Sequence, residues 1–347
     1  MQIPASPNEL SADWLSSVLS AQGWGPCRVE SFATELFGGE QGMTGELARV
    51  RLRYREERPG LPETVITKFS APEPGARAMI SELGHYEREV GFYELLAART
   101  PVPLPQSYYA LHDSDTGFAL LVLEDLGRAH NGNSIAGCSI DEVDLVLAAL
   151  ARLHAAWWRA DDLAGADWLR LRSLTAPEAM AAAFGDCWPM FLAKLSIPVT
   201  PEIIDLGDWV GQNVGAATTL FDAGPRTLIH NDVQPDNLFF ADVDGGVIWI
   251  DWQMATCARC VIDVANWIRG SLEPDVRRPV EPELLRRYHQ ALVENGVPDY
   301  SLDQCAADYR LAAVLAPARL ACAVAMSDGL QAHPGAFWDI LLPRYAD

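Results

Sequence analysis

The chain has 347 residues, of which 49% are hydrophobic, so it can bury a sizeable core and is long enough for about two domains of ordinary size. Its 26 basic and 47 acidic residues give a net charge of −21, which argues against nucleic acid and membrane surfaces as partners and favours cationic small molecules. The alternative is that the charge only maintains solubility.

The cysteine content and the apolar segments indicate the compartment. Seven cysteines form an odd and scattered set, unlike the paired framework of a small secreted domain. The first residues lack the basic start and apolar segment of a signal peptide. The most apolar late stretch, 311–326, is interrupted by Pro317 and Arg319 and is too short to span a bilayer. We therefore expect a cytoplasmic protein.

The first third of the chain predicts a small mixed lobe that ends near Glu124. Short apolar runs separated by Gly and Pro clusters are typical of strands, and longer periodic runs are typical of helices. In chain order we expect a helix, three strands, a helix and two strands, over 13–21, 29–37, 46–54, 64–69, 80–98, 108–112 and 119–123. Glycines gather between the first two strands, at Gly38, Gly39, Gly42 and Gly45.

From Ser139 onward the pattern becomes helical. Ser139 and Glu142 can form a capping box before the amphipathic run 143–158. The segment 227–251 returns to short apolar strands, and the helical pattern then resumes to the end. These patterns predict an α+β fold, with a small mixed lobe of strands and helices followed by a larger, mostly helical lobe.

The segment 227–251 predicts an antiparallel hairpin. Two apolar runs, 238–240 and 247–250, flank a turn signal rich in Asp and Gly. Asn237 and Asp251 lie just outside the strands at positions symmetric about the turn, so we expect side chains on the order of 5 Å apart. Amide and carboxylate oxygens at such a separation suit a hard cation such as Mg²⁺.

The residues around the hairpin form a larger pattern. Asp and Asn favour turns, so each alone could merely shape the loop. Together, His230, Asp232, Asn237 and Asp251 have the order H-x-D-x-x-x-x-N followed by a strand-ending Asp. This order is that of a kinase catalytic loop and its metal-binding aspartate.

A kinase interpretation requires a lysine and a glutamate in the first lobe. Lys68 lies in the strand 64–69, where a lysine is often simply solvated. On the helix 80–98, Glu89 shares a face with an apolar stripe, so its carboxylate needs a partner, and Lys68 is the candidate. The alternative is that Glu89 reaches water at the edge of the stripe.

The combined motifs resemble the aminoglycoside phosphotransferase and choline kinase superfamily. The segments GGEQGMTGELARV, YEREVGFYELL, LVLEDL, LARLHAAWW and IDWQ are most similar to its ecdysteroid-kinase-like branch. The resemblance covers nearly the whole chain from about Leu10. It implies a protein-kinase-like bilobal fold. The nucleotide-binding lobe, 1–125, would contain an antiparallel sheet and one main helix, and the larger, mostly helical lobe, 126–347, would be catalytic and substrate-binding. It also implies ATP-dependent phosphoryl transfer to a small molecule.

The resemblance also implies roles for individual residues. Lys68 would bind the α- and β-phosphates of ATP while Glu89 holds it, and Asp232 would accept the proton of the substrate hydroxyl. Asn237 and Asp251 would coordinate Mg²⁺. Nucleotide contacts would also come from a phosphate-covering loop and from a hinge against adenine, which correspond to Gly42, Met43, Thr44 and Gly45 and to Leu123, Glu124 and Leu126.

Further features support or depart from the family pattern. Asp263 resembles the helix aspartate that braces the catalytic loop, and His154 is expected to be a buried, hydrogen-bonded residue rather than a catalyst. The glycine-rich loop is not G-x-G-x-x-G. Gln234 stands where many relatives place a basic residue near the γ-phosphate, which removes one positive charge from the transition state.

Three functions compete on these residues. The first is a kinase that acts on a hydroxyl of an amino sugar, amino alcohol, sterol-like or antibiotic acceptor. The second is a catalytically inactive nucleotide-binding regulatory protein, which has no chemical need for the complete set of charged residues. The third is a metal-dependent hydrolase, which would leave Lys68 and Glu89 unexplained. The sequence specifies neither the acceptor nor the oligomeric state.

Overall fold

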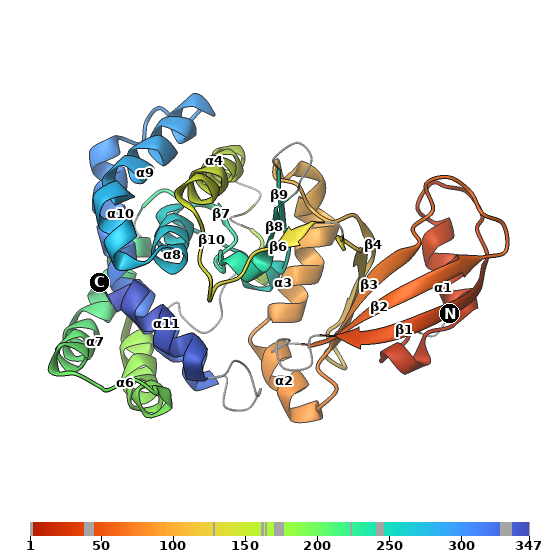
Figure 1. Cartoon of the computed structure of the whole chain (residues 1–347), viewed down its shortest axis with the longest axis horizontal. Helices are drawn as coiled ribbons and strands as arrows, with labels where there is room; N and C mark the ends of the chain where they lie inside the picture. Colours follow the sequence, from red (N-terminus) through yellow and green to blue (C-terminus); the bar gives the residue numbers. More distant parts are fainter. Residues whose placement is uncertain are drawn as a thin grey trace. The chain divides into compact units, whose positions relative to one another are not determined.

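The chain forms two compact units. The computed structural model describes residues 3–37, 45–127, 129–160, 163, 165–169, 177–222, 224–240, 246–326 and 335–346. Among these, the first unit comprises 3–98 and 104–127, and the second comprises 99–103 and the described residues from 129 onward (Figure 1). An antiparallel sheet dominates the first unit and helices dominate the second, which confirms the predicted α+β class.

The first unit is built on a five-stranded antiparallel sheet with strand order β1-β2-β3-β5-β4. Its strands are β1 (Val29–Phe37), β2 (Gly45–Tyr54), β3 (Thr64–Ser70), β4 (Ser107–Asp113) and β5 (Phe118–Glu124). Its helices and helical turns are Pro7–Glu9, α1 (Ala12–Ser20), α2 (Pro74–Glu82), α3 (His85–Gly91), a π-helical turn Phe92–Leu96 and the turn Ala97–Arg99, whose last residue belongs to the second unit. Each predicted strand is confirmed to within one residue at either end.

The predicted helix over 80–98 is wrong in its start and in its continuity, whereas helical turns do extend to Arg99, close to the predicted end. The helical segment begins earlier, at Pro74, because the Glu73 carboxylate accepts hydrogen bonds from the first free amides. It breaks at Gly84, whose φ of 73° is left-handed and ends α2 before α3 begins. The predicted apolar face of Glu89 is nevertheless present, since its stripe neighbours are buried.

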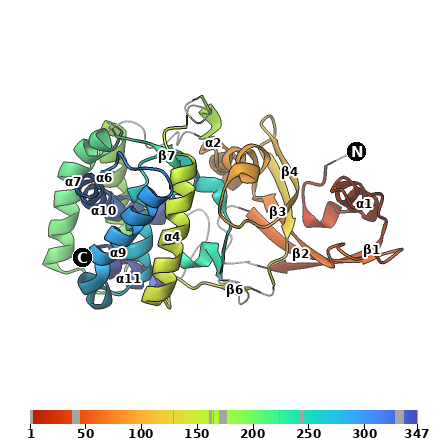
Figure 2. The ribbon, with the colours of Figure 1, turned by 90° about the horizontal axis from the view of Figure 1, so that it is seen from above.

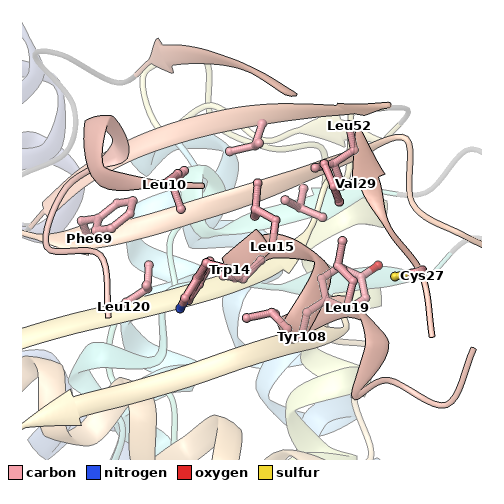
Figure 3. Close-up of a cluster of buried hydrophobic side chains, with 14 residues drawn as sticks. Leu10, Trp14, Leu15, Leu19, Cys27, Val29, Leu52, Phe69, Tyr108 and Leu120 are labelled. Atoms are coloured by element: carbon pink, nitrogen blue, oxygen red, sulfur yellow. The ribbon is translucent and has the colours of Figure 1, made fainter. Parts of the chain in front are cut away.

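An apolar cluster lies between α1 and one face of the sheet (Figure 3). Ser11 caps α1 by accepting a hydrogen bond from the Trp14 amide, and the helix then directs its apolar side chains at the strands. Figure 2 shows α1 beside the sheet. The buried members of the cluster are Leu10, Trp14, Leu15, Val18, Leu19, Cys27, Val29, Val50, Leu52, Val65, Phe69, Tyr108, Leu120 and Val122.

The second unit is mostly helical. Its helices are α4 (Ile140–Ala156), α6 (Pro177–Lys194), α7 (Pro201–Asp222), α8 (Val261–Ser271), α9 (Pro274–Glu294), α10 (Leu302–Met326) and α11 (Gly335–Ala346). Its strands are β6 (His130–Asn131), β7 (Thr227–Ile229), β8 (Leu238–Phe240), β9 (Val247–Trp249) and β10 (Thr256–Ala258). Short helical turns lie at Asp167–Leu169, Pro235–Asn237 and Trp252–Met254.

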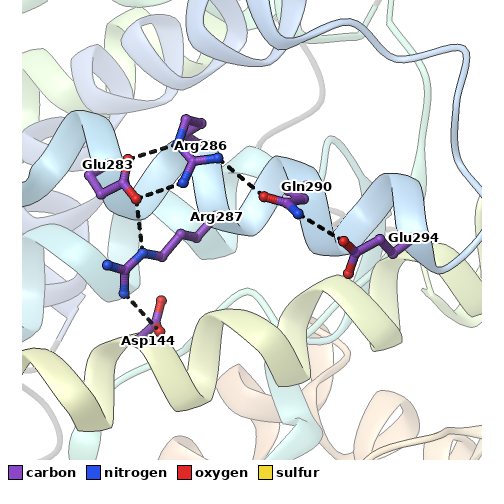
Figure 4. Close-up of polar contacts among 6 residues, drawn as sticks. All are labelled: Asp144, Glu283, Arg286, Arg287, Gln290 and Glu294. Atoms are coloured by element: carbon purple, nitrogen blue, oxygen red, sulfur yellow. Dashed lines mark hydrogen bonds and ion pairs between the residues drawn. The ribbon is translucent and has the colours of Figure 1, made fainter.

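Helix α4 begins at the predicted capping box. The Ser139 hydroxyl accepts from the Glu142 amide at 3.2 Å, and the Glu142 carboxylate accepts from the Ser139 amide at 2.7 Å. The helix packs along α9, and exposed side chains bridge the two helices at the Arg287–Asp144 ion pair (Figure 4). Because these charges stay solvated, the packing depends on buried contacts, such as that of His154 Nδ1 on α4 with the Tyr288 hydroxyl on α9, at 2.8 Å.

Helix α10 contains the apolar stretch noted in the sequence. It is 25 residues long and carries Pro317 in its interior. In the described part of the chain, no helix combines the length and apolar character that crossing a bilayer requires.

The α1 cluster generates a stability prediction. Leu15 is fully buried beneath the sheet, so Leu15→Ala should lower the free energy of unfolding by about 2–5 kcal/mol through lost burial and a residual cavity. Leu95→Ala is the control, because Leu95 is 59% exposed, and should change it by less than about 0.5 kcal/mol. Urea denaturation followed by circular dichroism measures both, and equal losses would contradict the cluster's role.

Candidate active site

In the first unit, Lys68 and Glu89 form a buried ion pair. The ammonium of Lys68 on β3 lies 2.8 Å from each carboxylate oxygen of Glu89 on α3. The two side chains are only 14% and 5% exposed. The structure thus brings together the lysine and glutamate that the sequence paired.

A small pocket surrounds this pair. It is lined by Lys68, Phe69, Ser70, Tyr86, Glu89, Val90, Ala119 and Leu121. The Tyr86 hydroxyl accepts a hydrogen bond from the Ala71 amide at 2.8 Å, which ties α3 to the end of β3. This bond and the Lys68–Glu89 pair both join α3 to β3, so the strand and the helix hold the Lys68 ammonium in a defined place.

The predicted hinge spans the end of β5 and the residues just beyond it. Leu123 and Glu124 end this strand, and the Glu124 amide already donates to the Gln106 carbonyl at 2.8 Å. The next residue, Asp125, receives two hydrogen bonds from Arg49 of β2, at 2.6 and 3.1 Å. The contact of Arg49 with Asp125 could not be expected from the sequence, because nothing local links two residues so far apart in the chain.

The predicted phosphate-covering loop lies mostly outside the described residues. Gly42, Met43 and Thr44 belong to the undescribed segment 38–44. Gly45 is described, and a Cβ there would come within 2.1 Å of the Phe69 carbonyl oxygen. The close approach of β3 therefore requires a glycine at position 45, whatever its role toward a nucleotide.

In the second unit, a loop over residues 230–237, the 230–237 loop, connects β7 to β8. Strand β7 pairs with β10, and the ring of His230 follows directly. Its Nε2 lies 2.9 Å from the Ile250 carbonyl oxygen, and its ring centroid is 4.6 Å from that of Trp252. These contacts make His230 a fixed structural residue at the start of the loop.

The carboxylate of Asp263 on α8 braces the 230–237 loop. Asp263 is fully buried and accepts from the His230 amide at 2.8 Å and from the Asn231 amide at 2.7 Å. Its predicted bracing role is confirmed. His154 of α4 is also buried, with Nε2 3.4 Å from Asp263 and Nδ1 2.8 Å from the Tyr288 hydroxyl. The expectation of a hydrogen-bonded structural histidine is confirmed as well.

Asp232 and Asn237 are in direct contact. The amide nitrogen of Asn237 lies 2.9 Å from the carboxylate Oδ2 of Asp232 and 2.9 Å from its main-chain carbonyl oxygen. Gln234 adds a longer contact, 3.4 Å, to the same carboxylate oxygen. Because both bonds of Asn237 use its nitrogen, its side-chain oxygen is the atom suited to a cation.

The hairpin exists, but its predicted register is wrong by one residue. Phe240 pairs with Val247, so an even number of residues lies between these paired positions. The prediction placed residue 244 at the centre of the turn, which requires an odd number. The Ile250 amide donates to the Asn237 carbonyl at 3.1 Å, so Asn237 stands opposite Ile250. Asp251 is therefore one position beyond the paired residue, where the chain adopts a left-handed φ of 64°.

The carboxyl of Asp232 is buried and feels the charge of Asp251. Burial raises the pKa of Asp232 to about 6, and the charge of Asp251 adds to this rise, against the opposing effects of His230, Asn237 and Arg319. Two carboxylates that repel each other beside an amide oxygen form a set that a divalent cation would stabilise. The donor chemistry of Asn237 and Asp251 thus fits Mg²⁺, which takes few protein ligands and keeps sites for phosphate oxygens.

Arg319 of α10 makes a second long-range contact, with Asn231, that could not be expected from the sequence. Its Nη2 donates to the main-chain carbonyl of Asn231 at 2.9 Å and also to the side-chain oxygen of that residue. The only local signal was a charged residue that interrupts an apolar stretch. A charge in such a position needs a partner, but the sequence does not show which one.

Both units therefore carry the elements of a protein-kinase-like phosphotransferase. A model of the phosphotransferase enzyme family matches residues 76–301, more than half of the chain. The chain belongs to this family. This confirms the resemblance at the level of the superfamily, while the ecdysteroid-kinase-like branch stays a prediction.

Solved structures share the fold at low sequence identity. A choline kinase of Streptococcus pneumoniae is 16% identical with a TM-score of 0.55, over 96% of this chain and 95% of that one. A choline kinase of Cryptosporidium parvum is 10% identical with a TM-score of 0.59, over 96% and 93%. The GDP and kanamycin complex of the phosphotransferase APH(2″)-IIIa is 13% identical with a TM-score of 0.54, over 88% and 89%. A comparison with curated protein sequences gives no match.

The bracing carboxylate generates a prediction. In Asp263→Asn, an amide nitrogen replaces one acceptor oxygen opposite a buried backbone N–H, so the free energy of unfolding should fall by about 3 kcal/mol or more. Asp186→Asn, at an exposed position of α6, should change it by less than about 0.5 kcal/mol. Chemical denaturation measures the free energy of unfolding of both variants. An Asp263→Asn protein as stable as the parent would show that the loop does not depend on this carboxylate.

Proposed function

We propose that the protein is an ATP-dependent phosphotransferase that transfers the γ-phosphate to a hydroxyl of a small molecule. The 230–237 loop carries this proposal. It presents the carboxylate of Asp232 in contact with Asn237 and near Asp251, on a backbone held by Asp263. A positioned carboxylate beside two oxygen ligands suits proton acceptance and phosphate charge neutralisation.

We assign nucleotide binding to the lobe 1–125. Lys68 would contact the α- and β-phosphates, and Glu89 would keep its ammonium in place. A buried ion pair adds little net stability, because desolvation offsets the attraction, so the pair is better explained by function. Other contacts would come from the phosphate-covering residues Gly42, Met43, Thr44 and Gly45 and from the hinge residues Leu123, Glu124 and Leu126.

We assign the metal and the chemistry to the lobe 126–347. Asn237 and Asp251 would hold Mg²⁺, which when bound neutralises charge on the phosphates. Asp232 would take the proton of the acceptor hydroxyl as that oxygen bonds to the γ-phosphorus. The bond from that phosphorus to the bridging oxygen breaks, and ADP leaves.

We propose a hydroxyl-bearing acceptor from the amino sugars, amino alcohols, sterol-like molecules or antibiotics. The charge of −21 favours a cationic member, and similar folds include choline kinases. The alternative, an inactive nucleotide-binding regulatory protein, does not explain why Asp232 is held beside Asn237. A third possibility, a metal-dependent hydrolase, does not explain the Lys68–Glu89 pair.

An ADP-release screen tests the proposal. The purified protein is incubated with Mg²⁺-ATP or Mg²⁺-GTP and with panels of amino sugars, amino alcohols, sterols and antibiotics. We expect at least one class to raise ADP or GDP release well above the rate without acceptor. Nucleotide binding without turnover on any panel would instead support the regulatory alternative.

The Lys68–Glu89 pair generates a prediction about nucleotide affinity. Lys68→Ala should weaken Mg²⁺-ATP binding by about tenfold or more, the loss expected for one charge-assisted contact. Arg53→Ala is the control, because Arg53 is an exposed cation of β2. Isothermal calorimetry measures both, and a Lys68→Ala protein with the parent's ATP affinity would refute the assignment.

Replacement of Asp232 and replacement of Asp251 should impair different steps of the reaction. Asp232→Asn should leave Mg²⁺-ATP binding nearly intact and lower kcat by about 10²-fold or more, the scale of a lost general base. Asp251→Asn should weaken metal-dependent ATP binding as well as turnover. Calorimetry with and without Mg²⁺, beside an ADP-release assay, gives the comparison.

Two results would contradict these roles. Turnover of Asp232→Asn at the parent rate would exclude Asp232 as the base. Tight Mg²⁺-ATP binding by Asp251→Asn would exclude Asp251 as a metal ligand.

A further inference from the structure

Asn231, between His230 and Asp232, has a backbone conformation that needs support. Its φ of 68° is left-handed, a region that side-chain-bearing residues adopt at a cost, although asparagine tolerates it better than most. This conformation turns the chain immediately before Asp232. The direction of the Asp232 carboxylate therefore depends on what holds Asn231 in this state.

Four hydrogen-bonding groups of Asn231 have partners. Its amide donates to Asp263 at 2.7 Å, and its side-chain nitrogen donates to the Met254 carbonyl at 3.0 Å. Arg319 donates to the two remaining groups, the main-chain carbonyl and the side-chain oxygen. Asp263 thus holds Asn231 from the amide side, and Arg319 holds it from the carbonyl side.

Arg319 reaches this position from a distant part of the chain. It lies in the second half of α10, 88 residues beyond Asn231, in a stretch that is otherwise apolar. The carbonyl and the side-chain oxygen of Asn231 are both neutral acceptors, so their bonds to a guanidinium are charge-assisted and stronger than neutral ones. Only a donor with several N–H groups can serve two acceptors of one residue from a fixed side.

We propose that Arg319 is a positioning residue for phosphoryl transfer, which fixes Asp232 through its contact with Asn231. This inference rests on the proposed function. Without the guanidinium, the carbonyl and side-chain oxygen of Asn231 lose their donors and the left-handed state loses support. Asp232 then no longer points at the acceptor hydroxyl, whereas the nucleotide-binding residues stay in place.

The test uses Arg319→Met and Arg319→Lys in the full chain, with Arg310→Met as the matched control. Arg310 lies on the same helix and is exposed. We expect Arg319→Met to lower kcat for ADP release about 10- to 100-fold, as misplacement of a reacting group does, with KM for Mg²⁺-ATP within about twofold of the parent. Arg319→Lys, which keeps the charge, should recover part of the loss.

A second readout does not require activity. Hydrogen exchange of the segment 228–233 should be about tenfold faster or more in Arg319→Met, while α8 and the first unit keep the parent's protection. If the parent releases no ADP on any acceptor panel, the proposed function fails, and the exchange result alone decides on positioning. Unchanged exchange at 228–233 overturns the inference.

Two further results would also overturn it. One is a parent-like kcat in Arg319→Met. The other is a lower kcat that is accompanied by a lower melting temperature and by faster exchange throughout the second unit, because that pattern indicates a general structural role. If Arg319→Met does not fold, the same two readouts are applied to Arg319→Lys, for which parent-like kcat and exchange would equally reject the role.

Discussion

The buried carboxylate of Asp263 is the constraint on which the second unit depends. A fully buried charge is costly unless hydrogen bonds compensate it, and the donors here are the amides of His230 and Asn231 together with His154. Satisfying this carboxylate therefore fixes the chain just before Asp232. The contacts of Asn231 with Arg319 and of Asn237 with Asp232 then complete a loop whose functional groups have defined directions.

In the first unit, buried charges also compensate each other, here as a pair of opposite sign. Lys68 lies on β3, which contributes Val65 and Phe69 to the α1 cluster, and Glu89 lies on α3, which packs against β4 and β5. Both side chains are largely buried. Each unit thus fixes its charged groups through its own folding. For phosphoryl transfer, charged groups that are oriented before the substrates bind need little reorganisation during the reaction.

Local sequence patterns predicted much of this arrangement. Strand alternation, the Ser139 capping box and the apolar stripe around Glu89 involve residues close in sequence, and the structure confirms them. The hairpin register was wrong because turn residues alone do not fix the number of residues between strands. The Arg49–Asp125 and Arg319–Asn231 contacts could not be predicted, since they join distant segments and leave no periodic signal.

In the proposed reaction, phosphate passes from ATP to an acceptor hydroxyl. Phosphorus-31 NMR tests this most directly, in a mixture of the protein, Mg²⁺-ATP and a pooled panel of hydroxyl-bearing cations. We expect loss of the γ-phosphate signal with matching growth of a phosphate monoester signal and of ADP. Growth of inorganic phosphate alone would indicate a hydrolase, and an unchanged ATP spectrum would indicate a binding protein; either result would contradict the proposed transfer.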